Sequence, residues 1–251
     1  MSDAAPNARS GADLARAGRI RAALFLPQFD NDPASGALRG RGTGAVAVEI
    51  TRILAARLGI EAQVVGYSTP SSVAAALKAG DCDLAFMGIE PSRAADLDFS
   101  PAIFHFDYTF LVPAGSGIGR VADADRPGLR VAIVRDHASS LTLSRIVKHA
   151  ELVGAALPDA AFDMLRAGTA DALALPRDVL LDLAAQLPGA RVLDDAYGFN
   201  RVGIAIRAQQ PERLAYLSEF VEAAKASGLI ARAIDSAGVR GFRVAPPSSA
   251  G

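Results

Sequence analysis

The sequence has 251 residues, of which 51% are hydrophobic and 21% charged, and its formal net charge is −1. This is enough apolar material for one large domain or two small lobes. A near-neutral balance gives no electrostatic reason to expect a nucleic acid or an anionic membrane as partner. Cys82 is the only cysteine, which excludes an internal disulfide and a thiolate metal cluster. We expect no metal and no other cofactor.

The first 18 residues are rich in Ala, Ser, Asp and Arg, and we expect them to form a flexible leader. They contain no apolar run of signal-peptide length, and no stretch of the chain approaches the roughly 20 apolar residues of a membrane span. Two interpretations stay open: the protein stays in the cytoplasm, or a leader has been removed.

Strands alternate with helices in the first part of the chain. Apolar runs predict strands at 20–26, 62–67 and 84–87, and helical spacing predicts helices at 46–58 and 71–78. Gly59 and Gly80 stand where these helices end. The alternation indicates parallel sheets built from βαβ units.

A long apolar strand at 104–113 is followed by a glycine-rich break, and the alternation then resumes. The pattern predicts strands at 129–134, 172–175 and 202–206 and helices from about 139 to 152, at 160–165, 179–185, 211–224 and 229–237. We expect the tail, 244–251, to be disordered.

One short pattern occurs twice. Gly80 and Asp83 recur as Gly168 and Asp171, each between a helix end and an apolar strand. Chance is one explanation, since such joints are common. The other is a pair of similar α/β lobes, each presenting the carboxyl end of a strand, where ligands of open α/β sheets bind.

The segment from Gly88 to Pro101, which reads GIEPSRAADLDFSP, resembles a known family. It is similar to the family 3 extracellular solute-binding proteins, the periplasmic receptors of polar amino-acid ABC transporters. The resemblance continues through 112–116, 128–133 and 168–172 and spans about 19–243. The stretch from Arg93 to the Asp-Phe-Ser motif is fairly specific to this family, whereas the other matching segments are common to α/β proteins in general.

The resemblance implies an α/β fold of the periplasmic binding protein-like type II, with two lobes joined by a two-strand hinge. Lobe 1 would hold 19–112 with 203–243, lobe 2 would hold 113–202, and the ligand would be captured by hinge closure. It further implies a periplasmic location, a monomer, an ABC transporter permease as partner, and no chemistry on the ligand.

Arg93 is the leading site residue that the resemblance implies, because the matching arginine of the family grips the ligand's carboxylate. A guanidinium is planar, permanently charged and bidentate toward carboxylates. The alternative is a surface arginine paired with Asp96. Gly88 stands where the family has Ser or Thr, and Glu90 either lines the site or is a helix-start acid.

Pro176 is the main departure from the family, which has at this position an Asp that pairs with the α-ammonium of an amino acid. Phe25 likewise stands roughly where relatives place an acidic or polar residue. Because a buried ammonium without a counter-charge is costly, we expect a small organic anion, a carboxylate without an α-ammonium. The alternative is an ordinary α-amino acid, if Glu90 or another acid takes the place of the missing Asp.

Further ligand contacts are expected from residues that follow predicted strands. Ser139 and Ser140 open a helix where relatives cradle the ligand, and Arg135 and His137 could add positive charge; helix capping is the alternative. Gln28 and Tyr67 follow the first two strands, and Phe25 could pack on an apolar part of the ligand.

An enzyme is the main alternative. The three histidines lack metal-ligand spacing, and there is no Gly-x-Ser-x-Gly elbow. Glu90 could donate a proton to an anionic substrate held by Arg93, as in cyclic-acid dehydratases of this fold. A freestanding ligand-sensing domain is a third possibility.

Overall fold

A computed structural model describes residues 14, 18–25, 29–31, 38–40, 42–90, 93–135 and 137–248. It divides into two compact units. The first holds the described residues up to 105, with 201–239 and those from 243 onward; the second holds 106–200 and 240–242. The sequence-based boundaries lie at 112/113 and 202/203 instead. The predicted leader and Gln28 fall almost wholly outside the described residues.

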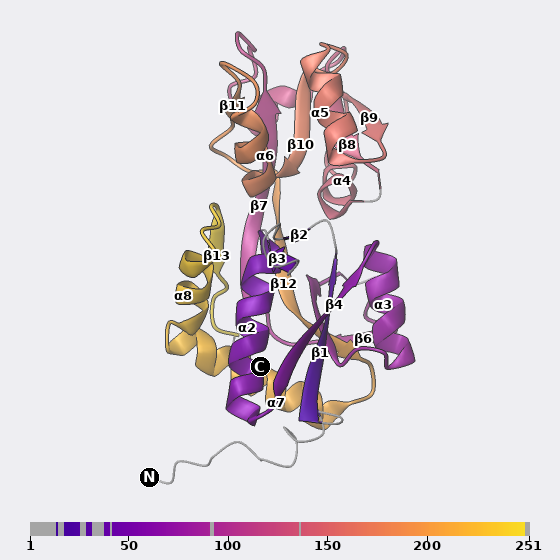
Figure 1. Cartoon of the computed structure of the whole chain (residues 1–251). Helices are drawn as coiled ribbons and strands as arrows, with labels where there is room; N and C mark the ends of the chain where they lie inside the picture. The colour runs from indigo at the N-terminus through magenta and orange to yellow at the C-terminus, as the bar shows by residue number, and fades with distance from the viewer. Residues whose placement is uncertain are drawn as a thin grey trace. The chain divides into compact units, whose positions relative to one another are not determined.

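The first unit is built on parallel strands. β1 (Arg19–Phe25) lies between β4 (Glu61–Tyr67) and β5 (Leu84–Gly88), and β12 (Gly198–Arg207) runs antiparallel to β5. The helices α2 (Thr43–Leu58) and α3 (Pro70–Ala79) lie on opposite sides of β1 and β4 (Figure 1). The predicted strands and helices of this region are confirmed, and both helices extend slightly beyond the predicted ends.

Several short elements of this unit were not predicted. They are the two-stranded sheet of β2 (Phe29–Asn31) and β3 (Leu38–Gly40), and β6 (Leu97–Phe99), which pairs with β12. The predicted helices near the end of the chain are present as α7 (Pro211–Ala226) and α8 (Leu229–Ser236).

The end of the chain differs from the predicted disordered tail. Val244 closes the strand β13 (Phe242–Val244), and the next residue, Ala245, is buried. The Ala245 N–H donates to the Ile103 carbonyl at 3.0 Å, and the Ser248 hydroxyl donates to the Glu222 carboxylate at 2.8 Å. These contacts order residues 244–248, which composition alone did not indicate.

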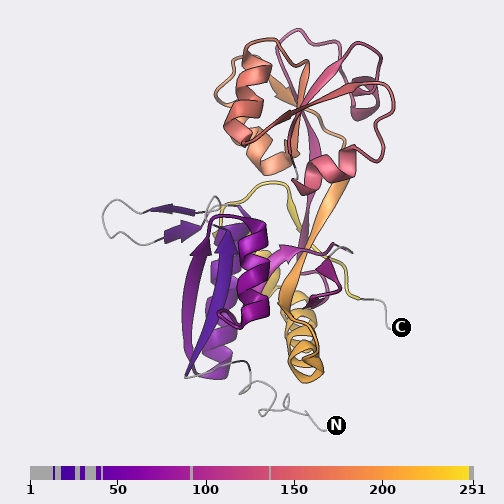
Figure 2. The same ribbon diagram turned by 90° about the vertical axis from the view of Figure 1, so that its right-hand side faces the viewer.

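The second unit repeats the parallel arrangement. β8 (Arg130–Val134) lies between β9 (Glu151–Ala155) and β10 (Ala172–Pro176), and β7 (Phe104–Val112) runs antiparallel to both β10 and β11 (Arg191–Val192). The helices are α4 (Ala138–Leu143), α5 (Pro158–Arg166) and α6 (Arg177–Ala184), with the short η4 (Val121–Ala124). Figure 2 shows this sheet nearly end-on, with helices around it.

The helix expected from about 139 to 152 is wrong in its second half. α4 ends at Leu143, and residues 151–155 form β9. The Asp125 carboxylate, distant in sequence, accepts the N–H groups of three successive residues, Lys148, His149 and Ala150, at 2.7–3.1 Å. This capture replaces helical hydrogen bonds and turns the chain into a strand.

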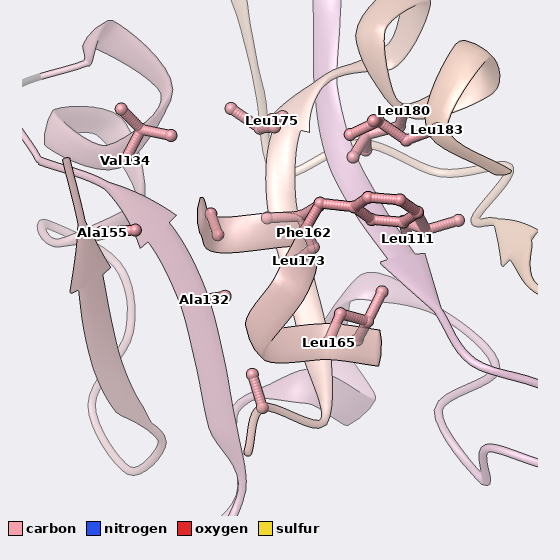
Figure 3. Packing of buried hydrophobic residues seen from close by; sticks show 12 residues of the cluster. Leu111, Ala132, Val134, Ala155, Phe162, Leu165, Leu173, Leu175, Leu180 and Leu183 are labelled. Carbon is pink, nitrogen blue, oxygen red and sulfur yellow. The ribbon is translucent and has the colours of Figure 1, made fainter. Parts of the chain in front are cut away.

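Each unit has apolar clusters of its own. In the second unit, α5 and α6 cover one face of the sheet, and α4 covers the other. Figure 3 shows the first of these clusters, with the ring of Phe162 beside Leu111 and Leu173. In the first unit, Val73, Ala76 and Leu77 of α3 pack on one face of β1 and β5.

Among the described residues, no helix is both long and apolar enough to cross a bilayer.

The repeated Gly and Asp make the same contact in both units. In the first unit, Asp83 accepts the Arg21 backbone N–H at 2.8 Å and pairs with its guanidinium at 2.9 Å, while Arg21 also donates to the Gly80 carbonyl at 2.9 Å. We call this arrangement the Arg–Asp clasp.

In the second unit, Asp171 accepts the Arg130 backbone N–H at 2.8 Å and pairs with its guanidinium at 3.1 Å, and Arg130 donates to the Gly168 carbonyl at 2.9 Å. Arg21 and Asp83 join neighbouring parallel strands near their amino ends, and so do Arg130 and Asp171. The repeat therefore reflects two similar α/β units rather than chance.

We predict that Asp83→Ala lowers the free energy of unfolding by about 3 kcal/mol, because it leaves a mostly buried guanidinium and a backbone N–H without their acceptor. Asp171→Ala should cost less, because in that pair the side chains of Arg130 and Asp171 are 37% and 32% exposed, against 24% and 3% for Arg21 and Asp83.

Urea unfolding followed by circular dichroism measures both losses. Asp81→Ala is the matched control, since Asp81 is exposed and only two residues from Asp83. Equal losses for Asp81→Ala and Asp83→Ala would contradict the structural role of the clasp.

Candidate functional site

In the first unit, three predicted site residues stand at the carboxyl ends of neighbouring parallel strands. Phe25 ends β1, Tyr67 ends β4 directly opposite it in the register, and Gly88 ends β5. Carboxyl ends of parallel strands share one edge of a sheet, which is where open α/β sheets bind ligands. The structure thus brings the backbone of these three positions together.

Arg93 is tied to this edge through its side chain. Its Nη1 donates to the Gly88 carbonyl at 2.8 Å, and its backbone N–H donates to the Glu90 carbonyl at 3.0 Å. The alternative pairing with Asp96 does not occur, because the Asp96 carboxylate pairs with Lys78 at 2.6 Å. No carboxylate of the described residues pairs with Arg93, so its other N–H groups can receive an anion.

The loop that carries Arg93 is held by contacts with β12 and the residues that follow it. The Ile89 N–H donates to the Arg201 carbonyl at 2.8 Å, and the Ile89 side chain packs where Gly203 has none. The buried Ser100 hydroxyl accepts the Ile204 N–H at 2.9 Å, and Asp98 accepts the Gln209 N–H at 3.0 Å. The Asp-Phe-Ser motif is therefore the scaffold of this loop.

Tyr67 is oriented differently from the expectation of a ligand contact. Its ring packs against the apolar cluster between α3 and the strands β1 and β5. Its hydroxyl lies 3.3 Å from the Cys82 sulfur, within hydrogen-bonding distance. This hydrogen bond and burial together raise the pKa of Tyr67 to about 12. Burial also raises the pKa of the Cys82 thiol, which keeps it protonated and inert.

Phe25 and Glu90 are both half-buried. No hydrogen bond or ion pair joins the Glu90 carboxylate to another residue that the structure describes. Gln28, predicted at the same edge, lies outside the described residues. Glu90 thus keeps both of its sequence-based interpretations.

The carboxyl edge of the second unit's sheet carries the other group of predicted residues. His137 is the N-cap of α4: its Nδ1 accepts the Ser139 N–H at 3.2 Å and lies 2.7 Å from the Ser139 hydroxyl. Burial lowers the pKa of His137 to about 4. The imidazole is neutral at pH 7, so His137 does not add the positive charge expected of it.

Ser139 and Ser140 are both buried, and their hydroxyls already have partners within the protein. The Ser140 hydroxyl donates to the Val134 carbonyl at 2.6 Å, and Ser139 is fully enclosed. Arg135 is exposed and donates to the Gly154 carbonyl, and its side chain lies so close to Gly154 that a Cβ there would be 2.8 Å from the Arg135 Cγ. These contacts agree with the capping interpretation of this segment.

Pro176 is buried at the end of β10, opposite Tyr108 of β7. Tyr108 stacks on Tyr197 with 6.0 Å between ring centroids. The buried Tyr197 hydroxyl faces Ser139 without a hydrogen bond of standard geometry. The structure therefore places positions 139 and 176 beside the same pair of aromatic rings. The sequence analysis gave no role to Tyr108.

Asp178 is the residue of this edge that the sequence analysis missed. It lies two residues after Pro176, in the first turn of α6, and its Oδ1 is buried without a hydrogen-bond partner among the described residues. An acid in the first turn of a helix is usually explained by the helix dipole, which hid the signal.

Metal binding finds no support in this part of the molecule. No group of three or more His, Cys, Asp or Glu side chains within the described ranges is placed to hold a metal ion. The sheet edge of each unit carries single charged groups instead.

The comparison with known proteins gives both a family and a fold. The family model described as bacterial extracellular solute-binding proteins, family 3, matches residues 35–236, which is most of the chain. A glutamine-binding protein from Geobacillus stearothermophilus is 28% identical over 124 residues, which cover 49% of this chain and 47% of that protein. The match thus spans about half the length of that relative.

Solved structures share the fold at low sequence identity. A protein from Wolinella succinogenes, designated a binding component of an ABC transporter and complexed with lysine, superimposes with a TM-score of 0.75 at 20% identity, covering 88% of this chain and 96% of that one. An ancestral amino acid-binding protein, described as a precursor of cyclohexadienyl dehydratase, gives 0.72 at 22%, covering 90% and 98%.

These relatives confirm the α/β fold of the periplasmic binding protein type II class, and the family match extends over far more than the short motif around Arg93. The chain belongs to the bacterial extracellular solute-binding proteins, family 3.

Proposed function

We propose that this protein is the solute receptor of an ABC-type importer and that it captures a small organic carboxylate without changing it chemically. The observation that carries the proposal is Arg93: a permanent cation, half-buried, at the carboxyl edge of a parallel sheet, with no carboxylate partner among the described residues.

The geometry at Arg93 suits a carboxylate. Its bond to the Gly88 carbonyl uses one N–H of Nη1 and restrains the side chain, while the remaining N–H groups can pair with two oxygens. A fixed guanidinium loses less side-chain entropy on binding than a mobile one. Phe25, half-buried at the same edge, is suited to an apolar part of the ligand.

The names of the relatives support this class of ligand. Glutamine and lysine, the ligands in the names of two of them, are carboxylates that also carry an α-ammonium, so they support a carboxylate ligand but not the expected lack of an ammonium. The family's description as extracellular supports a periplasmic location, and the ABC transporter in one name supports a permease as partner. The hinge closure and the monomeric state implied by the family resemblance stay predictions.

We predict that Arg93→Ala weakens binding of the carboxylate ligand by at least about 2 kcal/mol, because a bidentate charged contact is lost. The ligand is first found by thermal shift with the twenty common L-α-amino acids and the carboxylates that lack their α-ammonium. Isothermal titration then compares the variant with the unmodified protein.

The control is Arg52→Ala, which removes an arginine of the same unit whose side chain is 71% exposed on α2. It should leave the affinity unchanged. An Arg93→Ala protein that melts at the normal temperature and binds with unchanged affinity would refute the role given to Arg93.

A dehydratase-like enzyme is the second candidate, because the Glu90 carboxylate has no partner among the described residues and stands near Arg93 in the loop. The relative named as a dehydratase precursor is itself described as amino acid-binding, which favours a receptor.

We predict that incubation with prephenate, a cyclic hydroxy acid, gives no product by mass spectrometry. Any bound carboxylate should instead raise the melting temperature by mass action. Turnover that is abolished by Glu90→Gln would establish the enzyme and overturn the receptor.

A further inference from the structure

The chain passes between the two units at more places than the expected hinge supplies. Two passages lie within β7 and β12, which correspond to the two hinge strands that the family resemblance implies. After α8 the chain crosses again: residues 240–242 belong to the second unit, whereas the described residues on both sides of them belong to the first. We call residues 240–242 the strap.

The strap lies on α6 of the second unit. The Arg240 Nη2 is 3.6 Å from the Asp182 Oδ1, but both side chains are well exposed, so this pair contributes little. Gly241 makes the closer contact: a Cβ placed there would be 3.1 Å from the Arg177 Cδ, so the Arg177 side chain would have to shift. With a φ of +80°, Gly241 also has a backbone conformation that favours glycine. Position 241 therefore suits glycine for two independent reasons.

Arg177 offers the strap a fixed surface. Its guanidinium donates to three successive carbonyls, those of Leu193, Asp194 and Asp195, at 2.7–3.1 Å. These bonds hold the far end of the side chain, and the backbone of Gly241 lies against its aliphatic part. The contact thus joins the strap to a side chain that is itself fixed within the second unit.

Phe242 gives the strap its most buried contact. Its ring is buried and stacks on that of Phe106 in β7, with 4.9 Å between the ring centroids and 22° between the ring planes. Phe242 is also the first residue of β13, which pairs with β7. Each of these strands contains a passage between the units, since the unit boundaries fall between 105 and 106 and between 242 and 243. The β7 crossing is therefore a pair of strands.

The strap continues directly into contacts of the first unit. Ala245, the residue after β13, donates its N–H to the Ile103 carbonyl at 3.0 Å. The Lys225 ammonium donates to the Pro246 carbonyl at 2.9 Å. Because β13 is already extended, and an extended chain spans at most about 3.6 Å per residue, the link from Phe242 to Ala245 has little slack.

We propose that the strap and β13 stiffen the crossing at β7 and so restrict the movement of the two units relative to each other. A lone hinge strand bends through changes of φ and ψ at a few residues. Bending β7 also strains its pairing with β13 and the packing of Gly241 and Phe242 on the second unit. A protein restrained in this way loses less conformational freedom when it captures a ligand, which favours binding. The restraint stands independently of the ligand, and its effect on affinity rests on the proposed function.

The test measures the spread of distances between the units in the ligand-free full chain. Spin labels are attached at Arg52→Cys on α2 and Asp163→Cys on α5, where the side chains are 71% and 70% exposed. The native Cys82 is buried and is therefore not labelled in the folded protein. Pulsed electron paramagnetic resonance then gives the distribution of distances between the labels.

Two variants release the strap in different ways. Phe242→Ala removes the stacking on Phe106, and Gly241→Ala displaces the side chain of Arg177. Each should widen the distance distribution by about 1.5-fold or more, because β7 then bends more freely. If Phe242→Ala does not melt cooperatively, Phe242→Leu, which keeps most of the volume and loses the stacked ring, takes its place.

Gly238→Ala is the matched control. Gly238 has a positive φ of +64°, like Gly241, but an added Cβ would meet no atom within 4 Å. The substitution introduces the same kind of backbone strain in the same segment without a clash with the second unit, so the distribution should stay unchanged. An unchanged width in the folded strap variants overturns the inference, and so does equal widening in Gly238→Ala.

Isothermal titration with the carboxylate found by thermal shift tests the effect on capture. Both strap variants should bind it about threefold or more weakly than the unmodified protein, and Gly238→Ala should bind it equally well. Wider distributions with unchanged or tighter binding overturn the effect on affinity and leave the receptor intact. If no carboxylate binds, the proposed function fails, while the distance measurement still decides whether the strap restrains the units.

Discussion

The Arg–Asp clasp is the contact on which both units depend. One carboxylate takes the backbone N–H and the guanidinium of the same arginine, and that arginine reaches back to the glycine carbonyl that ends a helix. A single side-chain pair thus fixes a strand, the start of its neighbour and the helix end before it. The clasp lies at the amino ends of the strands, whereas the candidate site residues lie at the carboxyl ends of the same strands.

The two carboxyl edges are chemically unlike. The first unit presents Arg93, a cation held by the Gly88 carbonyl, whereas the corresponding edge of the second unit carries a neutral His137 and the unpaired Asp178. Among the described residues, Arg93 and Glu90 at the first edge and Asp178 at the second have no ion-pair partner.

The alternation of strands and helices could be predicted from the sequence, because glycines that end helices and the spacing of apolar residues are local signals. The predictions that were wrong depended on contacts with residues distant in the sequence. The helix through position 152 is interrupted by Asp125, more than twenty residues earlier, and the order of Ala245 comes from its bond to Ile103. The charge of His137 and the orientation of Tyr67 follow from burial and from Cys82, which no spacing in the sequence reveals.

The site shows the same division between local and distant information. Arg93 was chosen as the leading candidate because its motif is specific, and the motif's Asp98 and Ser100 support its loop through hydrogen bonds. Asp178 was not singled out, because the resemblance directs attention to position 176 and an acid in the first turn of a helix is an ordinary feature. Proline suits the start of α6, since its fixed φ is compatible with the N-cap and it has no N–H to satisfy. The Oδ1 of Asp178 is buried there without a hydrogen-bond partner among the described residues, and burial raises its pKa, so the charged form of this acid lowers the stability of the protein.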